Sequence, residues 1–234
     1  MASKISTAVL VHGAWADGSS WGSVIGSLRA AGLNVVVPQL PLTSLADDVA
    51  ALERTLERVD GPVVLVGHAY GGAVIAEARS DKVQSLAYVA AIAPDEGETV
   101  AQVFGRAPPH PQAPPLAPDT HGLVWLPLEA FGRAVAPNAS DELQAQLAAV
   151  QRPIALACIT TPVGRPRWKD VPAWYLVAEQ DRMILRDTQE FMAMRMGATI
   201  VSHPVDHVPS LTAPELVTYT ILAAVRTAEG ELAC

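Results

Sequence analysis

Gly67-His68-Ala69-Tyr70-Gly71 is the stretch of this chain that decides its fold. It follows a short apolar run, Pro62 to Val66, and it precedes a segment typical of a helix, Gly72 to Ala78. A short apolar run is typical of a buried strand, and glycines allow the chain to turn sharply. The stretch therefore predicts a strand, a tight turn and a helix in direct succession, with Ala69 at the turn.

Further apolar runs predict more strands, and these strands alternate with helices. The predicted strands are Thr7 to Val11, Val35 to Pro38, Val63 to Val66, Leu86 to Ile92, Trp174 to Val177 and Thr199 to Ser202. They show little polar alternation, as is typical of parallel strands that are buried on both faces. Such an order of strands and helices predicts an α/β fold with a doubly wound, mostly parallel sheet.

Some of the helices between these strands have recognisable ends. One helix is predicted to begin at Ser44, with Asp47 placed as in a capping box, and to end before Gly61. The last helix is predicted to have Thr212 as its N-cap and Glu215 three residues later.

The region from 97 to 166 interrupts the alternation of strands and helices. Eight of the nineteen prolines lie between Pro108 and Pro137, and proline-rich backbone cannot form a central strand. We therefore expect residues 97–166 to form a lid that is inserted into a core made of residues 1–96 and 167–234. A long mobile loop is the alternative. The lid could also form the contact of a homodimer.

Composition narrows the classes of protein to consider. Half of the 234 residues are apolar and 17% are charged, which is typical of one globular domain. The net charge of -8 does not favour a nucleic-acid partner, because phosphate binding needs clustered Lys and Arg. The beginning of the sequence lacks the pattern of a signal peptide, and no apolar run approaches the roughly 18 residues of a membrane span. We expect a cytoplasmic protein that does not associate with membranes.

The cysteine content and the spacing of polar residues bear on cross-links and metals. Two cysteines, Cys158 and Cys234, do not favour a disulfide framework, although they leave a single bridge open. The sequence has no cluster of residues with the spacing of metal ligands. We expect neither a metal nor another cofactor.

Several residues have the types and positions that acyl transfer requires. This chemistry needs a nucleophile, a base, a group that orients the base, and donors for the oxyanion. The turn at Ala69 is the nucleophile position, but alanine has no reactive atom. The oxyanion donors would be the N–H groups of Ala14, in the turn that begins with His12-Gly13, and of Tyr70. The N–H of Tyr70 lies at a helix N-terminus, which favours negative charge.

The acid and the base are expected on loops that follow late strands. Asp181 follows the strand that ends at Val177, and His207 lies between the last strand and the last helix. The alternative for Asp181 is a surface turn in which it pairs with Arg182. The rival residues are Asp95 and Asp206 for the acid and His203 for the base.

With these residues in place, the chain resembles the α/β-hydrolase superfamily over essentially its full length. The order of nucleophile position, acid and base is that of the family, whose G-x-S-x-G motif places serine at a strand–turn–helix junction. The chain is similar to a small bacterial esterase-like group and to the plant methylesterase and hydroxynitrile lyase branch. The segments that carry the resemblance are 11–15, 67–72, 180–184 and 206–208. Relatives have serine where this chain has Ala69.

Two departures from the lyases of that branch favour ester hydrolysis over cyanohydrin cleavage. Those lyases typically place Lys directly after the catalytic histidine and lack the glycine of the His-Gly turn, whereas this chain has Val208 and Gly13. The resemblance thus implies a serine-type carboxylic ester hydrolase that acts on a small-molecule ester. We expect a hydrophobic or aromatic ester, with amides, carbamates and lactones left open. The residues expected to line its pocket are Trp15, Trp125, Leu128, Phe131 and Met183.

Ala69 permits two hypotheses. In the first, the chain is a hydrolase whose serine has been replaced, because every other part of the catalytic site is retained. In the second, the alanine is native, and the protein binds a small ligand or uses Asp181 and His207 as a base. Lyases and cofactor-free oxygenases of this fold are examples of such base chemistry.

Overall fold

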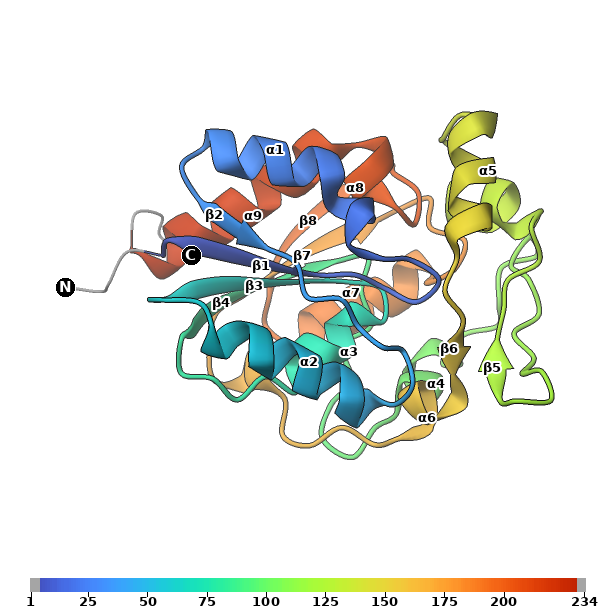
Figure 1. Ribbon diagram of the computed structural model, residues 1–234, viewed down its shortest axis with the longest axis horizontal. Coiled ribbons are helices and arrows are strands. Elements are labelled where there is room, and N and C mark those ends of the chain that lie inside the picture. Colours follow the sequence, from blue (N-terminus) through green and yellow to red (C-terminus); the bar gives the residue numbers. More distant parts are fainter. Residues whose placement is uncertain (1–4, 231–234) are drawn as a thin grey trace.

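The computed structural model describes residues 5–230 and shows a six-stranded sheet between two layers of helices (Figure 1). The strand order is β2-β1-β3-β4-β7-β8, and all neighbouring strands are parallel. This arrangement confirms the predicted α/β fold. The strands are β1 (Thr7–Val11), β2 (Asn34–Val36), β3 (Val63–His68), β4 (Val83–Val89), β7 (Ala173–Ala178) and β8 (Thr199–His203).

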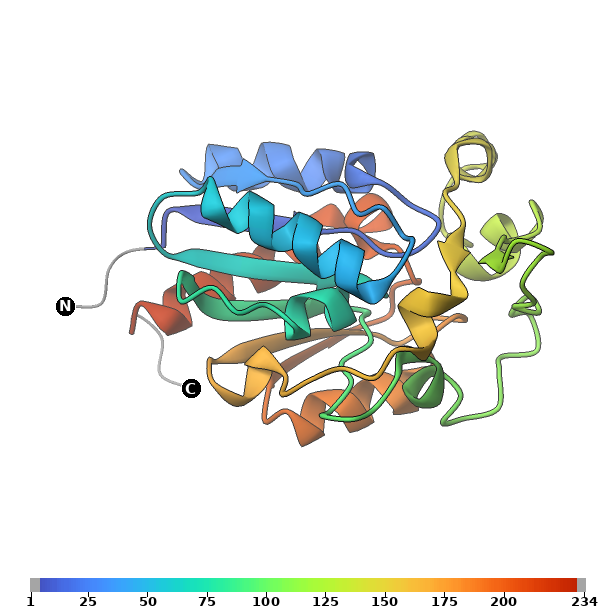
Figure 2. The same ribbon diagram turned by 60° about the horizontal axis from the view of Figure 1, so that its bottom comes forward.

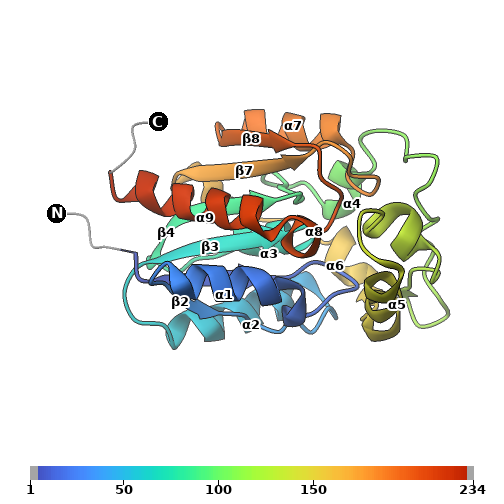
Figure 3. The ribbon, with the colours of Figure 1, turned by 90° about the horizontal axis from the view of Figure 1, so that it is seen from above.

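The two helical layers bury the two faces of the sheet in separate apolar clusters. On one face lie α1 (Gly22–Ala30) and α9 (Pro214–Ala228), which also contact each other (Figure 3). The other face is covered by α2 (Leu45–Glu57), α3 (Gly71–Ala76) and α7 (Arg186–Arg195). Because both faces are covered, β1, β3 and β7 are buried along their whole length, as their apolar sequences predict.

The ends of several elements differ from the sequence-based expectation. The hydroxyl of Ser44 accepts from the N–H of Asp47 at 3.0 Å, as predicted, but the carboxylate of Asp47 accepts from the Ser44 hydroxyl instead of completing a capping box. The prediction of Thr212 as an N-cap is wrong. Thr212 ends the short helix α8 (Pro209–Thr212), and α9 begins with Pro214. The hydroxyl of Thr212 instead donates to Asp206 at 2.7 Å.

Most of residues 97–166, which we call the cap, lies beyond the carboxyl ends of the strands, and the chain after α6 runs back along the core (Figure 2). They contain short elements joined by extended, proline-rich chain, rather than one long loop. The elements are α4 (Val100–Phe104), β5 (Leu123–Val124), a π-helical turn (Phe131–Val135), α5 (Asp141–Val150), β6 (Ile154–Ala155) and α6 (Leu156–Thr160). β5 and β6 pair antiparallel. That this region is a separate lid with these boundaries stays a prediction.

The structure bears on three expectations, which concern membrane-spanning helices, metal sites and cysteine pairing. Among residues 5–230, no helix is long and apolar enough to cross a membrane. The same residues contain no group of three or more His, Cys, Asp and Glu that could hold a metal ion. Cys158 is a buried free thiol. Cys234 and the first four residues lie outside the described part of the chain.

Candidate active site

Ala69 forms the sharp turn between β3 and α3. Its φ is 49°, in the left-handed region, which costs a residue with a Cβ about 1 to 2 kcal/mol. The glycines after it let the turn press against the sheet. A Cβ on Gly71 would lie 2.6 Å from the carbonyl oxygen of Val11, and one on Gly72 would lie 2.4 Å from that of Ile92. The turn thus holds the Ala69 side chain at the carboxyl edge of the central strands.

The structure brings His207 and Asp181 together beside this turn. Nδ1 of His207 lies 2.8 Å from Oδ2 of Asp181, so the imidazole donates to the carboxylate when its proton is on Nδ1. Oδ1 of Asp181 accepts from the N–H groups of Met183 at 2.7 Å and Ile184 at 2.9 Å. Gln189 donates to Oδ2 at 2.9 Å. These donors fix the carboxylate, and the carboxylate in turn orients the imidazole.

The alternative acids, Asp95 and Asp206, and the alternative base, His203, are not paired with the residues of this site. Asp95 forms an ion pair with Lys169. Asp206 is buried, and its oxygens accept from the N–H groups of Asn138 and Val208. His203 is half-buried at the end of β8 and forms neither a hydrogen bond nor an ion pair with Asp181. Asp181 is therefore the carboxylate that faces His207.

The surface-turn alternative for Asp181 is wrong. Arg182 donates to the carbonyl oxygen of Arg133 at 2.6 Å, not to Asp181. Asp181 is only 4% exposed, so it lies in the protein interior and not on a surface turn.

His68 is a functional candidate that the sequence analysis did not identify. Its Nε2 lies 2.6 Å from the carbonyl oxygen of His207, so His68 donates to the backbone of the residue that faces Asp181. Burial, with a smaller contribution from the nearby His207, lowers the pKa of His68 to about 3. The ring is thus neutral at neutral pH and has one N–H to donate. Nothing in the sequence distinguishes this histidine from an ordinary strand-end residue.

The two predicted oxyanion donors border the same cavity as Ala69 and His207. Within residues 5–230, the N–H groups of Ala14 and Tyr70 donate to no protein acceptor, so both are free for a ligand. Gly13 allows the close approach of the two turns, because a Cβ there would lie 2.8 Å from Cβ of Ala69. Unpaired N–H groups near a nucleophile position can bind a developing negative charge.

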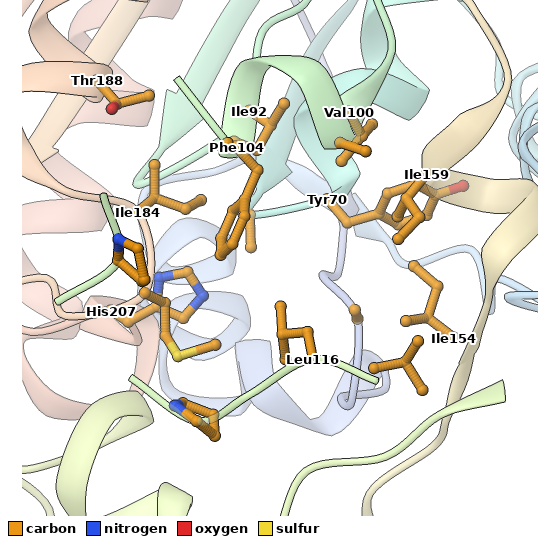
Figure 4. Close-up of a pocket in the computed structure, with 18 of the residues that line it drawn as sticks. Tyr70, Ile92, Val100, Phe104, Leu116, Ile154, Ile159, Ile184, Thr188 and His207 are labelled. Atoms are coloured by element: carbon orange, nitrogen blue, oxygen red, sulfur yellow. The ribbon is translucent and has the colours of Figure 1, made fainter. Parts of the chain in front are cut away.

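The cavity above Ala69 has a volume of about 380 Å³ and an almost entirely apolar wall (Figure 4). Among the residues that the structure describes, no Asp, Glu, Lys or Arg lines it. Trp15 and Met183 contribute to the wall as predicted, and the indole of Trp15 donates to the carbonyl oxygen of Val124 at 2.9 Å. The wall therefore favours an uncharged, hydrophobic ligand.

The prediction that Trp125, Leu128 and Phe131 line the cavity is wrong. Trp125 is 46% exposed and Leu128 is 67% exposed, so both face outward from the cap. Phe131 is buried in an apolar cluster between the cap and the core residues Met183 and Val208. Sequence alone did not show which way these side chains turn, because the cap lacks a regular period.

Another part of the wall was not expected from the sequence. The cavity is also bordered by Phe104, Leu116 and four prolines, which are Pro108, Pro109, Pro114 and Pro115. The proline richness was a usable signal, since proline has no N–H and can border an apolar cavity without leaving a donor unpaired.

The profile of the alpha/beta hydrolase family matches residues 8–218, and the chain belongs to this family. A pyrethroid hydrolase from Sphingobium faniae JZ-2 has a similar solved structure, with a TM-score of 0.81 and 22% identity. That comparison covers 98% of this chain and 100% of the other, and it bears on the fold alone.

Curated relatives of the chain are named esterases. A carbendazim hydrolyzing esterase of Nocardioides sp. (strain SG-4G) is 34% identical over 116 residues. That match covers 43% of this chain and 48% of the relative. Methylesterase 2 of Arabidopsis thaliana is 25% identical over 255 residues, which covers 92% of this chain and 94% of the relative. These relatives support ester hydrolysis at the level of the family.

Proposed function

We propose that this member of the alpha/beta hydrolase family has the site of a serine-type carboxylic ester hydrolase, with alanine at the nucleophile position. One observation carries the proposal. A strained turn at Ala69, the hydrogen-bonded pair of Asp181 and His207, and the unpaired N–H groups of Ala14 and Tyr70 surround one cavity. The curated relatives that are named esterases add support at the family level.

With serine at position 69, the site would hydrolyse an ester in two steps. His207, oriented by Asp181, takes the hydroxyl proton while the oxygen attacks the ester carbonyl carbon. The N–H groups of Ala14 and Tyr70 stabilise the resulting oxyanion. As the C–O bond breaks, His207 protonates the leaving alcohol, and a water then releases the acid from the acyl-enzyme by the same route.

With Ala69, the covalent route is closed, because no atom of alanine can attack the carbonyl. The oxyanion donors, the imidazole and the apolar cavity are unaffected by the missing hydroxyl. The chain as it stands is therefore an ester-binding protein with at most the residual catalysis of a dismantled triad. We infer that the ligand is a small, uncharged, hydrophobic or aromatic ester, since the described residues of the cavity wall include no Asp, Glu, Lys or Arg.

Restoring the hydroxyl tests this function. We expect Ala69→Ser to raise kcat/KM for p-nitrophenyl butyrate by at least about 10³-fold over the parent chain. The matched control is Ala101→Ser, which adds a hydroxyl to another residue of the same cavity wall. This control is expected to leave activity at the parent level. If Ala69→Ser stays inert towards a broad panel of aryl and alkyl esters, the proposed function is wrong.

A further inference from the structure

Tyr70 offers its N–H to the cavity but directs its hydroxyl away from it (Figure 4). The hydroxyl donates to Oδ2 of Asp48 at 2.7 Å. Both side chains are buried. The ring of Tyr70 thus forms part of the cavity wall, and its far end is held by a carboxylate on α2.

Asp48 is an unusual residue for the inner face of a helix. It is fully buried, and within residues 5–230 it pairs with no Lys, Arg or His. Burial raises the pKa of its carboxyl, while the hydrogen bond from Tyr70 acts in the opposite direction. A buried carboxylate without a cation is costly, and an apolar residue would satisfy the amphipathic pattern of α2. Its hydrogen bonds join α2 to two other parts of the chain.

The same carboxylate also holds residues 154–160, the part of the cap where the chain returns to the core, which we call the returning segment. Oδ1 of Asp48 accepts from the N–H of Leu42 at 2.7 Å, and Leu42 has a strained φ of 61°. The carbonyl oxygen of Leu42 accepts from the N–H of Ala155, at the start of the returning segment, at 3.0 Å. Cys158 of α6 donates to Oδ2 of Asp48 at 3.6 Å. Asp48 is therefore hydrogen-bonded to the residue after Ala69 and, directly and through Leu42, to the cap.

The returning segment is also part of the cavity wall. Ile154 and Ile159 flank Cys158 in sequence, and both border the cavity opposite His207 (Figure 4). Movement of this segment would change the shape of the cavity, because Ile154 and Ile159 border it. Tyr70 and this segment are both hydrogen-bonded to Asp48.

We propose that Asp48 is a positioning residue that fixes the oxyanion donor Tyr70 and the returning cap segment 154–160 in one arrangement. Through it, the position of segment 154–160 and the geometry of the oxyanion site are set together. This inference rests on the proposed function for its catalytic consequence, but its structural consequence can be measured in the chain as it stands.

The structural consequence is tested by hydrogen–deuterium exchange of the parent chain and of Asp48→Asn, which keeps the size of the side chain. We expect exchange of the amides in segments 40–44 and 153–160 to become at least about tenfold faster, while β1 and β3 keep their protection. Asp47→Asn is the matched control on the same helix. Asp47 is exposed, and among residues 5–230 its side chain is hydrogen-bonded only to Thr43 and Ser44, so exchange in 153–160 is expected to stay unchanged. Unchanged exchange of 153–160 in Asp48→Asn would overturn the proposal.

The catalytic consequence is tested in the Ala69→Ser background. We expect Asp48→Asn and Tyr70→Phe each to lower kcat by about tenfold with KM within about twofold, because a slightly misplaced donor weakens transition-state binding more than substrate binding. The double variant is expected to lose no more than Asp48→Asn alone, because the hydrogen bond that Tyr70→Phe removes is already disrupted by Asp48→Asn. A purely structural role would lower thermal stability and leave kcat intact, and that outcome would contradict the proposal.

The exchange experiment and the kinetic experiment together distinguish failure of this inference from failure of the proposed function. If Ala69→Ser itself is inactive, the proposed function fails, and the exchange experiment still decides whether Asp48 holds the cap. If Ala69→Ser is active but kcat is insensitive to Asp48→Asn, only the inference fails.

Discussion

At position 69, the chain keeps a strained backbone without the side chain that makes such strain useful. Ala69 has a φ of 49°, where glycine would be more stable. Strained backbone in proteins clusters at functional sites, where the surrounding structure maintains it. Here the surroundings are Gly71 and Gly72, pressed against the ends of β1 and β4, and Gly13, pressed against Ala69 itself. The surrounding residues thus hold the turn in its strained conformation, and they do so without a nucleophilic side chain at position 69.

The pairing of His207 with Asp181 leads to the first prediction at this scale. In the Ala69→Ser background, Asp181→Asn is expected to lower kcat by about 10⁴-fold, because the amide favours the wrong imidazole tautomer. His207→Ala is expected to lower kcat by a similar factor. The matched control is His203→Ala, since His203 is half-buried on β8 and does not contact Asp181. Steady-state kinetics measure the effect. A loss with His203→Ala as large as with His207→Ala would contradict the assignment of the base.

His68 leads to a prediction about stability and pH. Burial lowers its pKa in the folded protein to about 3, against the ordinary histidine value of 6.5, so the unfolded chain binds more protons between these values. The contribution of His68 to the free energy of unfolding is therefore fully present above about pH 6.5 and decreases as the pH drops towards 3. About 2 kcal/mol of this contribution is lost between pH 7 and pH 5. Urea unfolding at the two pH values measures it.

The control for this prediction is His68→Gln, which keeps a donor near the carbonyl oxygen of His207 but cannot titrate. The difference in unfolding free energy between pH 7 and pH 5 is expected to be smaller in this variant by about 2 kcal/mol. Equal pH dependence in the two proteins would show that His68 is not held neutral.

At the scale of elements, the sequence predicted the strands well and their ends less well. The apolar runs of β1, β3 and β7 are unambiguous because both faces of these strands are buried. β4 was predicted to extend to Ile92, but it ends at Val89, since Ala90 has a positive φ of 44° that no periodicity indicates. Thr212 has the type and spacing of an N-cap, but its hydroxyl bonds to Asp206, which the sequence could not place beside it.

The cap leads to a prediction at the same scale. Phe131 is 2% exposed in a cluster that includes Met183 and Val208, which lie on the loops of the site. Phe131→Ala is expected to reduce the free energy of unfolding by about 3 kcal/mol, because it leaves a cavity between the cap and these loops. Leu128→Ala is the matched control. Leu128 is 67% exposed, so its removal is expected to change stability by less than about 0.5 kcal/mol. Urea unfolding compares the two, and equal losses would show that Phe131 does not join the cap to the core.

At the scale of the molecule, the sheet brings together residues that are far apart in the sequence. The turns after β1 and β3 carry Ala14, Ala69 and Tyr70, and the loops after β7 and β8 carry Asp181 and His207. All four strands are parallel, so their carboxyl ends meet at one edge, where ligands bind in open α/β sheets. The sequence could predict this convergence, because it needs only strand order and loop position.

The rest of the cavity could not be predicted in the same way. The cap crosses the edge of the sheet along a path set by long-range contacts, such as the bond from Ala155 to Leu42 and the indole of Trp15 at Val124. The polar contacts of Asp48 and His68 likewise join residues separated by tens of positions. No local pattern in the sequence indicates them.

The central claim is that position 69 is the nucleophile position of an otherwise assembled acyl-transfer site. It is tested most directly by treating Ala69→Ser and the parent chain with a fluorophosphonate and locating the adduct by mass spectrometry, which requires no knowledge of the natural ester. We expect one adduct, on residue 69, in Ala69→Ser, and none in the parent chain or when His207→Ala is added. An Ala69→Ser protein that forms no adduct, or forms it at another residue, would show that position 69 is not the nucleophile position.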